Sequence, residues 1–152
     1  AAIATKTLGD DHQGISFYHS PVDDLSVPDD ETLLRVLDII ISHFELKEEQ
    51  RQKQQRPLDR DSSSGSSAVY VHCWGGRGRA GTIGGCVLAL FFPELGGEAV
   101  LGLVQEAYSS RSGATTMPGP LKRSPQTEAQ RAAVRAFAKR IQVAADFESS
   151  GT

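Results

Sequence analysis

The chain has 152 residues, of which 39% are hydrophobic, so it has the size of one domain with a packed core and is not a disordered chain. Its formal net charge of −3 gives no general sign of a nucleic-acid partner, and no apolar run reaches the roughly 18 residues of a transmembrane segment. The two cysteines lack Cys or His pairs at zinc-site spacing, which argues against a zinc site or a disulfide-stapled secreted fold and favours a reducing, cytoplasmic compartment.

The first third of the chain predicts a short strand and then a long helix. Residues 15–18 alternate in polarity as a strand does. After a turn-rich stretch, Asp29 or Asp30 can cap a helix, and Glu31 suits its N-terminal end. The apolar face of this helix repeats at helical spacing: Leu33, Val36, Leu37, Ile40, Ile41 and Phe44.

The middle of the chain changes composition sharply. Residues 47–67 are rich in charged residues, Gln, Ser and Gly, and we expect the helix to fade there into a flexible polar insertion without chemistry. Residues 68–72, Ala-Val-Tyr-Val-His, form the best strand pattern in the sequence. A glycine-rich loop follows, and then a buried helix over 82–92 that ends at Pro93.

Two further helices complete the expected single domain, residues 1–152. Apolar residues at helical spacing predict one amphipathic helix up to about Ser109. The last helix is expected to start near Pro125, which suits a first helical turn.

The glycine-rich loop from Cys73 to Gly81 has the layout that phosphate chemistry needs. The N-terminus of the following helix offers unpaired N–H groups and partial positive charge, and glycines let the backbone curl around an anion. Arg79 can grip two phosphate oxygens with its planar guanidinium. A cysteine in such a positive field loses its proton easily, so Cys73 is a candidate nucleophile.

The pattern His72-Cys73-x-x-Gly76-x-x-Arg79 resembles the signature of the protein tyrosine phosphatase superfamily, with Cys73 and Arg79 at its C-x5-R spacing. The variant Cys-Trp-Gly-Gly-x-Gly-Arg is most similar to small dual-specificity-like phosphatases near the kinase-associated phosphatase group. This resemblance implies an α/β fold with a small central sheet flanked by helices. It also implies hydrolysis of a phosphate monoester in a phosphoprotein or phosphopeptide, on tyrosine or on serine and threonine, through a phosphocysteine intermediate.

The resemblance further implies which residues bind the phosphate, and it implies no cofactor and no metal. The binding residues are those of the loop: Trp74, Gly75, Gly76, Arg77, Gly78 and Arg79. His72 is expected to hydrogen-bond the loop backbone and tune Cys73. Trp74 is a pocket wall or, as we expect, a packing residue. Arg77 is equally well interpreted as a solvated charge or as a rim residue that favours a highly anionic substrate, such as a phosphoinositide or a diphosphorylated peptide.

A general acid is implied on an upstream loop, because residues 20–28 resemble the acid loop of these enzymes. The match places the acid at Asp24, with Asp23 as the second choice, although Asp is also common in ordinary turns. Related enzymes use a Gln to position water, and the resemblance places it at Gln130. Thr127 and Gln130 also fit a capping box, in which Gln130 only closes the start of the last helix.

The chain departs from the family pattern directly after the arginine, where Ala80 replaces the usual Ser or Thr. That hydroxyl stabilises the departing thiolate, so its absence predicts slow breakdown of the phosphoenzyme. Thr82 is close in sequence, but its position does not match. A catalytically weak phosphate-binding module is therefore one alternative function, and a phosphoinositide phosphatase is another.

Other interpretations of the same residues are less consistent with the sequence. Residues 76–81 also fit the dinucleotide-binding pattern G-x-G-x-x-G, but the second strand and acidic residue that this unit needs do not follow. The acid loop argues against a rhodanese-like or arsenate-reducing enzyme. Cys86 lies in an apolar helix and is interpreted as a core residue.

The expected sheet raises one difficulty, because the family normally builds four or more strands. Only fourteen residues precede Ile15, and just two segments are convincing strands. Either an N-terminal part of the fold is missing from the sequence, or Ala2 to Thr7 supply a short strand.

Overall fold

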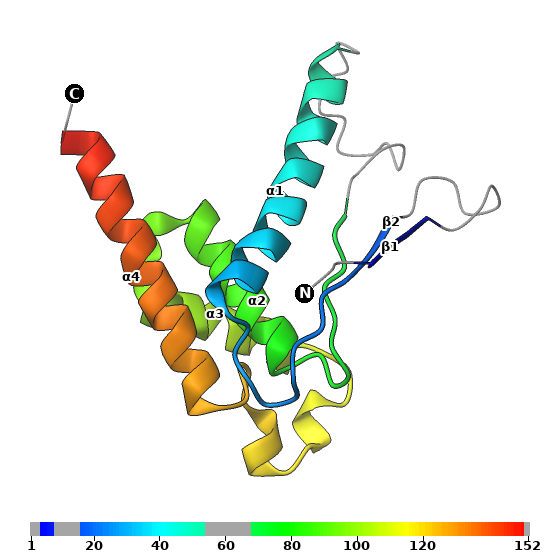
Figure 1. Cartoon of the computed structure of the whole chain (residues 1–152). Coiled ribbons are helices and arrows are strands. Elements are labelled where there is room, and N and C mark those ends of the chain that lie inside the picture. Colours follow the sequence, from blue (N-terminus) through cyan, green and yellow to red (C-terminus); the bar gives the residue numbers. More distant parts are fainter. Residues whose placement is uncertain (1–3, 8–15, 54–67, 151–152) are drawn as a thin grey trace.

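The structure is a computed structural model that describes residues 4–7, 16–53 and 68–150. Within these ranges the helices dominate (Figure 1). The elements in chain order are β1 (Ala4–Thr7), β2 (Ser16–His19), α1 (Asp30–Lys53), α2 (Arg79–Phe91), η1 (Pro93–Leu95), α3 (Gly96–Ser109), η2 (Ala114–Thr116), η3 (Gly119–Lys122) and α4 (Glu128–Ser150), where η denotes a short 3-10 helix.

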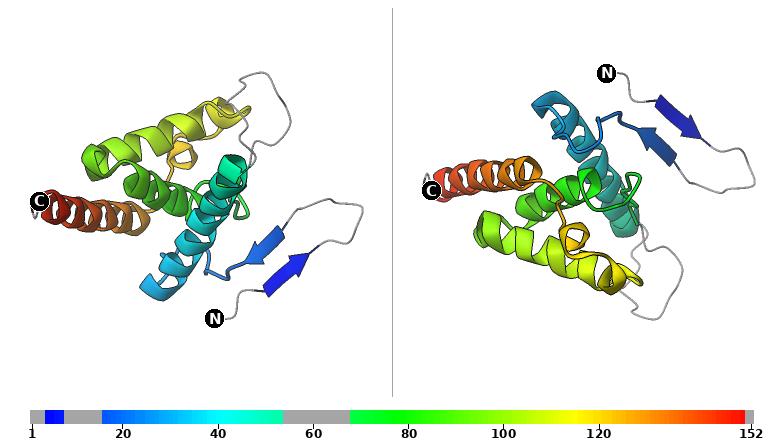
Figure 2. Two further views of the ribbon diagram at one scale, coloured as in Figure 1. Left: turned by 90° about the horizontal axis from the view of Figure 1, so that it is seen from above. Right: turned by 90° about the horizontal axis from the view of Figure 1, so that it is seen from below.

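The central sheet expected from the sequence is not confirmed. In the described residues, the sheet consists of β1 and β2 alone, paired antiparallel with Ala4 opposite His19. A strand near the position of β2 was predicted, and a strand within residues 2–7 was one of the two alternatives. The pair lies at the edge of the molecule, outside the group of helices (Figure 2), and every side chain of β2 is exposed.

The strand expected over residues 68–72 is absent from the structure. These residues are assigned neither to a strand nor to a helix, and all five are exposed. A strand needs a ladder partner, and no described segment pairs with this one, although its composition favours β-structure. The segment instead leads, without regular structure, into the glycine-rich loop.

Helix α1 begins where the sequence predicts. The backbone N–H of Thr32 donates to the Asp29 carboxylate at 2.7 Å, so Asp29 is the cap. On the expected apolar face, Leu33, Leu37 and Ile40 are buried. The helix runs to Lys53, and the remainder of the expected insertion, residues 54–67, lies outside the described residues.

The hydrophobic core lies between the four long helices. Helices α2, α3 and α4 pack against one another, and α1 covers α2. Two glycines allow close approach to α4: an added Cβ at Gly85 would lie 2.8 Å from Val134, and one at Gly97 would lie 2.8 Å from the Arg135 backbone. The core residues are Leu33, Leu37, Ile40, Ile83, Cys86, Ala89, Val100, Leu101, Val134, Phe137 and Ala138.

Helix α4 begins at Glu128, three residues after the position expected from Pro125. The reason is the capping box that the sequence predicts. The backbone N–H of Gln130 donates to the Thr127 hydroxyl at 3.1 Å, and the Thr127 N–H donates to the Gln130 side-chain oxygen at 3.0 Å. Thr127 is therefore the cap, and this prediction is confirmed.

In the described part of the chain, no single helix has both the length and the apolarity to cross a membrane. Helix α2 and the following segment Pro93–Ser109 would meet those criteria only as a pair, and they are bent by 103°.

Candidate active site

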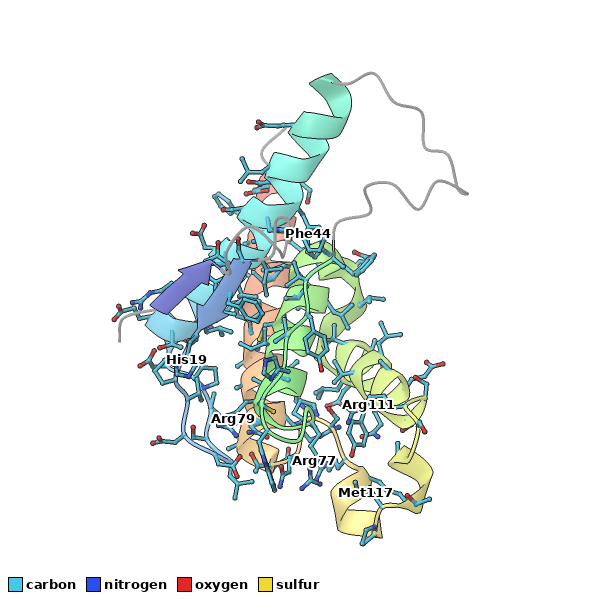
Figure 3. All side chains as sticks on the ribbon, turned by 90° about the vertical axis from the view of Figure 1, so that its right-hand side faces the viewer. His19, Phe44, Arg77, Arg79, Arg111 and Met117 are labelled. Carbon is cyan, nitrogen blue, oxygen red and sulfur yellow. The ribbon has the colours of Figure 1, made fainter. Side chains whose placement is uncertain are left out.

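A cavity of about 240 Å³ opens where three segments distant in sequence meet: the glycine-rich loop before α2, the segment between β2 and α1, and the region from the end of α3 to the start of α4. Figure 3 shows Arg77, Arg79, Arg111 and Met117 at this end of the molecule. The residues that line the cavity are Asp24, Cys73, Trp74, Gly75, Arg77, Gly78, Arg79, Tyr108, Met117 and Gln126.

Cys73 is a half-buried free thiol at the start of the loop. Burial by itself would raise its pKa, but the loop overcomes this effect. Hydrogen bonds from the backbone N–H groups of Ala80, Gly76 and Arg77, together with the charge of Arg79, hold the pKa of Cys73 below the ordinary value of a thiol. This environment favours the thiolate, which is the nucleophilic form of cysteine.

Arg79 connects the loop to the upstream segment that carries the two aspartates. Its Nη2 lies 3.0 Å from the Asp24 Oδ1, and its Nη1 donates to the Val22 carbonyl at 2.8 Å. In the described part of the chain, the Nε of Arg79 has no hydrogen-bond partner and is shielded from solvent. A buried donor without a partner is costly, so a partner for this atom would be stabilising.

The structure distinguishes between the two aspartates. Asp24 lines the cavity and pairs with Arg79, while its side chain remains 70% exposed. Asp23 does not line the cavity. Its carbonyl instead accepts hydrogen bonds from the Ser26 N–H at 3.2 Å and the Ser26 hydroxyl at 2.7 Å, and so closes a turn.

Buried hydroxyl groups fix the shape of the loop. The Ser124 hydroxyl donates to the Arg77 carbonyl at 2.8 Å, and the Ser124 N–H donates to the Gln105 side chain at 2.9 Å. The Thr82 hydroxyl donates to the Gly78 carbonyl at 3.0 Å. Thr82 is therefore occupied with the loop backbone, and does not replace the hydroxyl that is missing at residue 80.

Gln130 lies beside the cavity but does not line it. Its side chain is completely buried. The side-chain oxygen accepts the N–H groups of Gln126 at 3.1 Å and of Thr127 at 3.0 Å, and the side-chain nitrogen donates to the Ser26 carbonyl at 2.9 Å. One amide thus joins the aspartate segment to the start of α4. Its role in positioning water remains a prediction.

The expected packing role of Trp74 is wrong, because its side chain is 97% exposed at the wall of the cavity. The His72 Nδ1 lies 3.4 Å from the Cys73 carbonyl, which agrees with the expected contact to the loop backbone. Cys86 is fully buried, and burial raises its pKa to about 12. It is a core residue, as expected.

The sequence analysis missed three cavity residues, Tyr108, Met117 and Gln126. Gln126 could have been considered from the sequence, because it lies only four residues before the candidate site residue Gln130. Its side-chain oxygen lies near the loop, 3.3 Å from where a Cβ on Gly78 would stand. Tyr108 and Met117 reach the cavity only through the packing of α3 and the turn that follows it, so no local pattern marks them.

Comparison with known proteins identifies the family of the chain. Residues 10–134, more than half of the chain, match the family described as Swiss Army Knife protein, DSP-PTPase phosphatase domain (PTP-SAK). The match includes the glycine-rich loop, both aspartates and the start of α4. No curated protein and no solved structure matches the chain significantly.

Proposed function

Because the chain belongs to the DSP-PTPase phosphatase domain family, we propose that it hydrolyses phosphate monoesters of phosphorylated proteins through a phosphocysteine intermediate on Cys73. The observation that carries this proposal is the grouping of three side chains in one cavity. Cys73 supplies a thiol with a lowered pKa, Arg79 an unpartnered buried donor, and Asp24 a carboxyl group.

In the first step, the Cys73 thiolate attacks the phosphorus atom, a P–S bond forms and the P–O bond of the ester breaks. Asp24 in its protonated form gives its proton to the departing oxygen. The N–H groups that hold the sulfur, and the guanidinium of Arg79, are placed to bind the oxygens of the transferring phosphoryl group.

In the second step, a water oxygen attacks the phosphorus atom and the P–S bond breaks. Asp24, now a carboxylate, takes a proton from the water, and inorganic phosphate and the Cys73 thiolate are released. Gln126 lines the cavity and carries both a donor and an acceptor, so we propose that it orients this water. Gln130, the residue predicted for this role, would then act indirectly, by accepting the Gln126 backbone N–H.

A second candidate function is supported by Ala80 and by the hydrogen bond of Thr82. Without a hydroxyl after Arg79, and with the Thr82 hydroxyl bonded to the Gly78 carbonyl, the departing thiolate lacks one stabilising donor. The chain would then bind phosphate, or form the phosphoenzyme, and turn over slowly.

The test of the proposed function is hydrolysis of para-nitrophenyl phosphate by the wild-type chain, Cys73→Ser and Cys86→Ser. We expect turnover by the wild type, loss of turnover in Cys73→Ser, and retention in Cys86→Ser, because Cys86 is a core residue. A folded wild-type protein without turnover would contradict the active-enzyme proposal and leave the phosphate-binding module.

Ala80→Thr separates the two candidates further. If breakdown of the phosphoenzyme limits the rate, the wild type should show an initial burst of para-nitrophenol, and the added hydroxyl should raise kcat and reduce the amplitude of that burst. An unchanged kcat together with no burst in either protein would show that loss of this hydroxyl does not limit turnover.

A further inference from the structure

Arg111 lies against the phosphate loop, at the end of the molecule that holds the cavity, and the two proposed chemical steps do not use it. Its guanidinium carbon is 4.2 Å from the centre of the Tyr108 ring, and Tyr108 lines the cavity. A Cβ on Gly76 would lie 2.8 Å from the Arg111 Nη1, so the guanidinium rests on the bare backbone of that glycine. Gly76 adopts a positive φ of 64° and is one of the residues whose N–H binds the Cys73 sulfur.

The position of Arg111 is therefore held on two sides, by the aromatic ring and by the glycine backbone. Tyr108 lines the cavity, and Gly76 belongs to the loop whose N–H groups hold the Cys73 sulfur. In the described part of the chain, no carboxylate forms an ion pair with Arg111. Its side chain is exposed, so the guanidinium can reach a ligand without a change of fold.

The charges around the cavity are unbalanced. Arg77 and Arg79 line it, Arg111 stacks on the ring of the lining residue Tyr108, and Asp24 is the single carboxylate among the lining residues. Arg79 and the loop N–H groups are sufficient to bind one phosphate group. The positive charge of Arg111 is then available to bind a second anionic group of the ligand, close to the phosphate group that the loop binds.

We propose that Arg111 forms a second anion subsite, which binds a phosphate or carboxylate group that the same peptide carries beside its phosphorylated residue. The proposal rests on the proposed function, because it assumes that a phosphopeptide occupies the cavity. Arg111 would be a specificity-determining residue: it selects acidic phosphopeptides and takes no part in the two chemical steps.

The distribution of the other basic residues favours a peptide over an anionic membrane. A membrane surface attracts clusters of about 4–8 Lys and Arg residues. Here Arg123 and Arg135 pair with Glu128, and Arg140 pairs with Asp30. The exposed apolar side chains of Trp74 and Met117 lie at the same cavity and offer contacts to neighbouring residues of a peptide.

The subsite is tested with three phosphotyrosine peptides of otherwise equal sequence, whose neighbouring positions carry Ser, Glu or phosphoserine. The proteins compared are the wild type, Arg111→Gln and Lys139→Gln. Gln is a polar, uncharged side chain, so this substitution removes the guanidinium that stacks on Tyr108 and its charge together. Lys139 is an exposed cation on α4 that does not line the cavity, so its variant controls for net charge.

We expect kcat/KM of the wild type to rise from the Ser to the Glu to the phosphoserine peptide, by about threefold or more in total. In Arg111→Gln this rise should disappear, while kcat/KM for the Ser peptide stays within about twofold. Lys139→Gln should behave as the wild type does.

Three results would overturn the subsite: no preference in the wild type, an equal loss by Arg111→Gln on all three peptides, or the same loss of preference in Lys139→Gln. Binding of the protein to phosphatidylserine vesicles that depends on Arg111, without any discrimination among the peptides, would also overturn it.

Peptide binding by Cys73→Ser, with and without Arg111→Gln, separates the subsite from the catalytic proposal. If the wild type hydrolyses none of the peptides but Cys73→Ser still binds them in the expected order, the proposed hydrolysis fails and the subsite stands. If neither hydrolysis nor ordered binding is found, the subsite fails as well.

Discussion

At the scale of single residues, the two cysteines show how position alone changes the chemistry of one side chain. Cys73 sits among loop N–H groups and the Arg79 guanidinium, which lower the pKa of its thiol. Cys86 has no such donors, and burial between helices raises the pKa of its thiol to about 12. The same atom is therefore a thiolate candidate in one place and an inert core group in the other.

This contrast predicts selective alkylation by iodoacetamide. At pH 7, Cys73 should react quickly and Cys86 not at all in the folded protein, because the thiolate is the reacting form. The rate at Cys73 should fall as the pH is lowered through its depressed pKa, and Arg79→Ala should move that fall to higher pH. Mass spectrometry of the modified protein measures both sites, and equal labelling of Cys73 and Cys86 would contradict the assignment.

The ion pair between Asp24 and Arg79 predicts opposite effects on binding and on turnover. Asp24→Asn removes a negative charge that competes with phosphate for Arg79, so inorganic phosphate should inhibit about threefold more strongly. Turnover should fall by about 100-fold, because the proton donor is lost.

Asp23→Asn is the matched control for this prediction, since it makes the same charge change one residue away and outside the cavity lining. Equal effects of the two substitutions on turnover would contradict the assignment of the acid to Asp24.

At the scale of elements, the site depends on how closely α2 packs against α4, because the loop and the capping box lie at the first turns of these helices. Gly85 faces Val134 so closely that an added Cβ would lie 2.8 Å and 3.0 Å from its two methyl groups. A Cβ added to its neighbour Gly84 would have no atom within 4 Å outside the nearby backbone of the helix itself. Both glycines are interior to the same helix.

Alanine substitutions at Gly84 and at Gly85 should therefore change the free energy of unfolding in opposite directions. Gly85→Ala should lower the free energy of unfolding by about 1–3 kcal/mol, because the helices must separate. Gly84→Ala should raise it by about 0.5–1 kcal/mol, since alanine is the better helix former and meets no neighbour. Urea unfolding followed by circular dichroism measures both, and a stabilising Gly85→Ala would show that α2 and α4 pack less closely than described.

At the scale of the whole molecule, one buried amide holds together parts of the chain that are 104 residues apart. Gln130 on α4 donates to the Ser26 carbonyl, next to the aspartates, while its oxygen accepts two N–H groups at the helix start. The general-acid candidate and the cavity residue Gln126 are therefore placed by the same side chain.

Gln130→Leu should lower the free energy of unfolding by about 3 kcal/mol, because it leaves two partly buried N–H groups and one partly buried carbonyl without a partner. Thr127→Ala, which removes only the helix cap, should cost about 1 kcal/mol. Urea midpoints compare the two variants. Equal losses would show that the contact of Gln130 with Ser26 adds nothing beyond the cap.

The sequence by itself determined those features that depend only on residues close together in the chain. Hydrophobic periodicity predicted the helices. Asp29 or Asp30 predicted one helix cap, and the pair Thr127 and Gln130 predicted another. The spacing of Cys73 and Arg79 predicted one anion loop. These features are local, because backbone hydrogen bonds within a turn and the C-x5-R spacing involve residues only a few positions apart.

Tertiary structure alone decided which distant residues meet at the loop. It brought Asp24, the first choice of the family resemblance, against Arg79, brought Tyr108, Met117 and Gln126 into the cavity, and exposed Trp74. It also left residues 68–72 without a ladder, although their composition favours a strand. Strand pairing and cavity lining both require partners far along the chain, and no pattern of neighbouring residues specifies which partners those are.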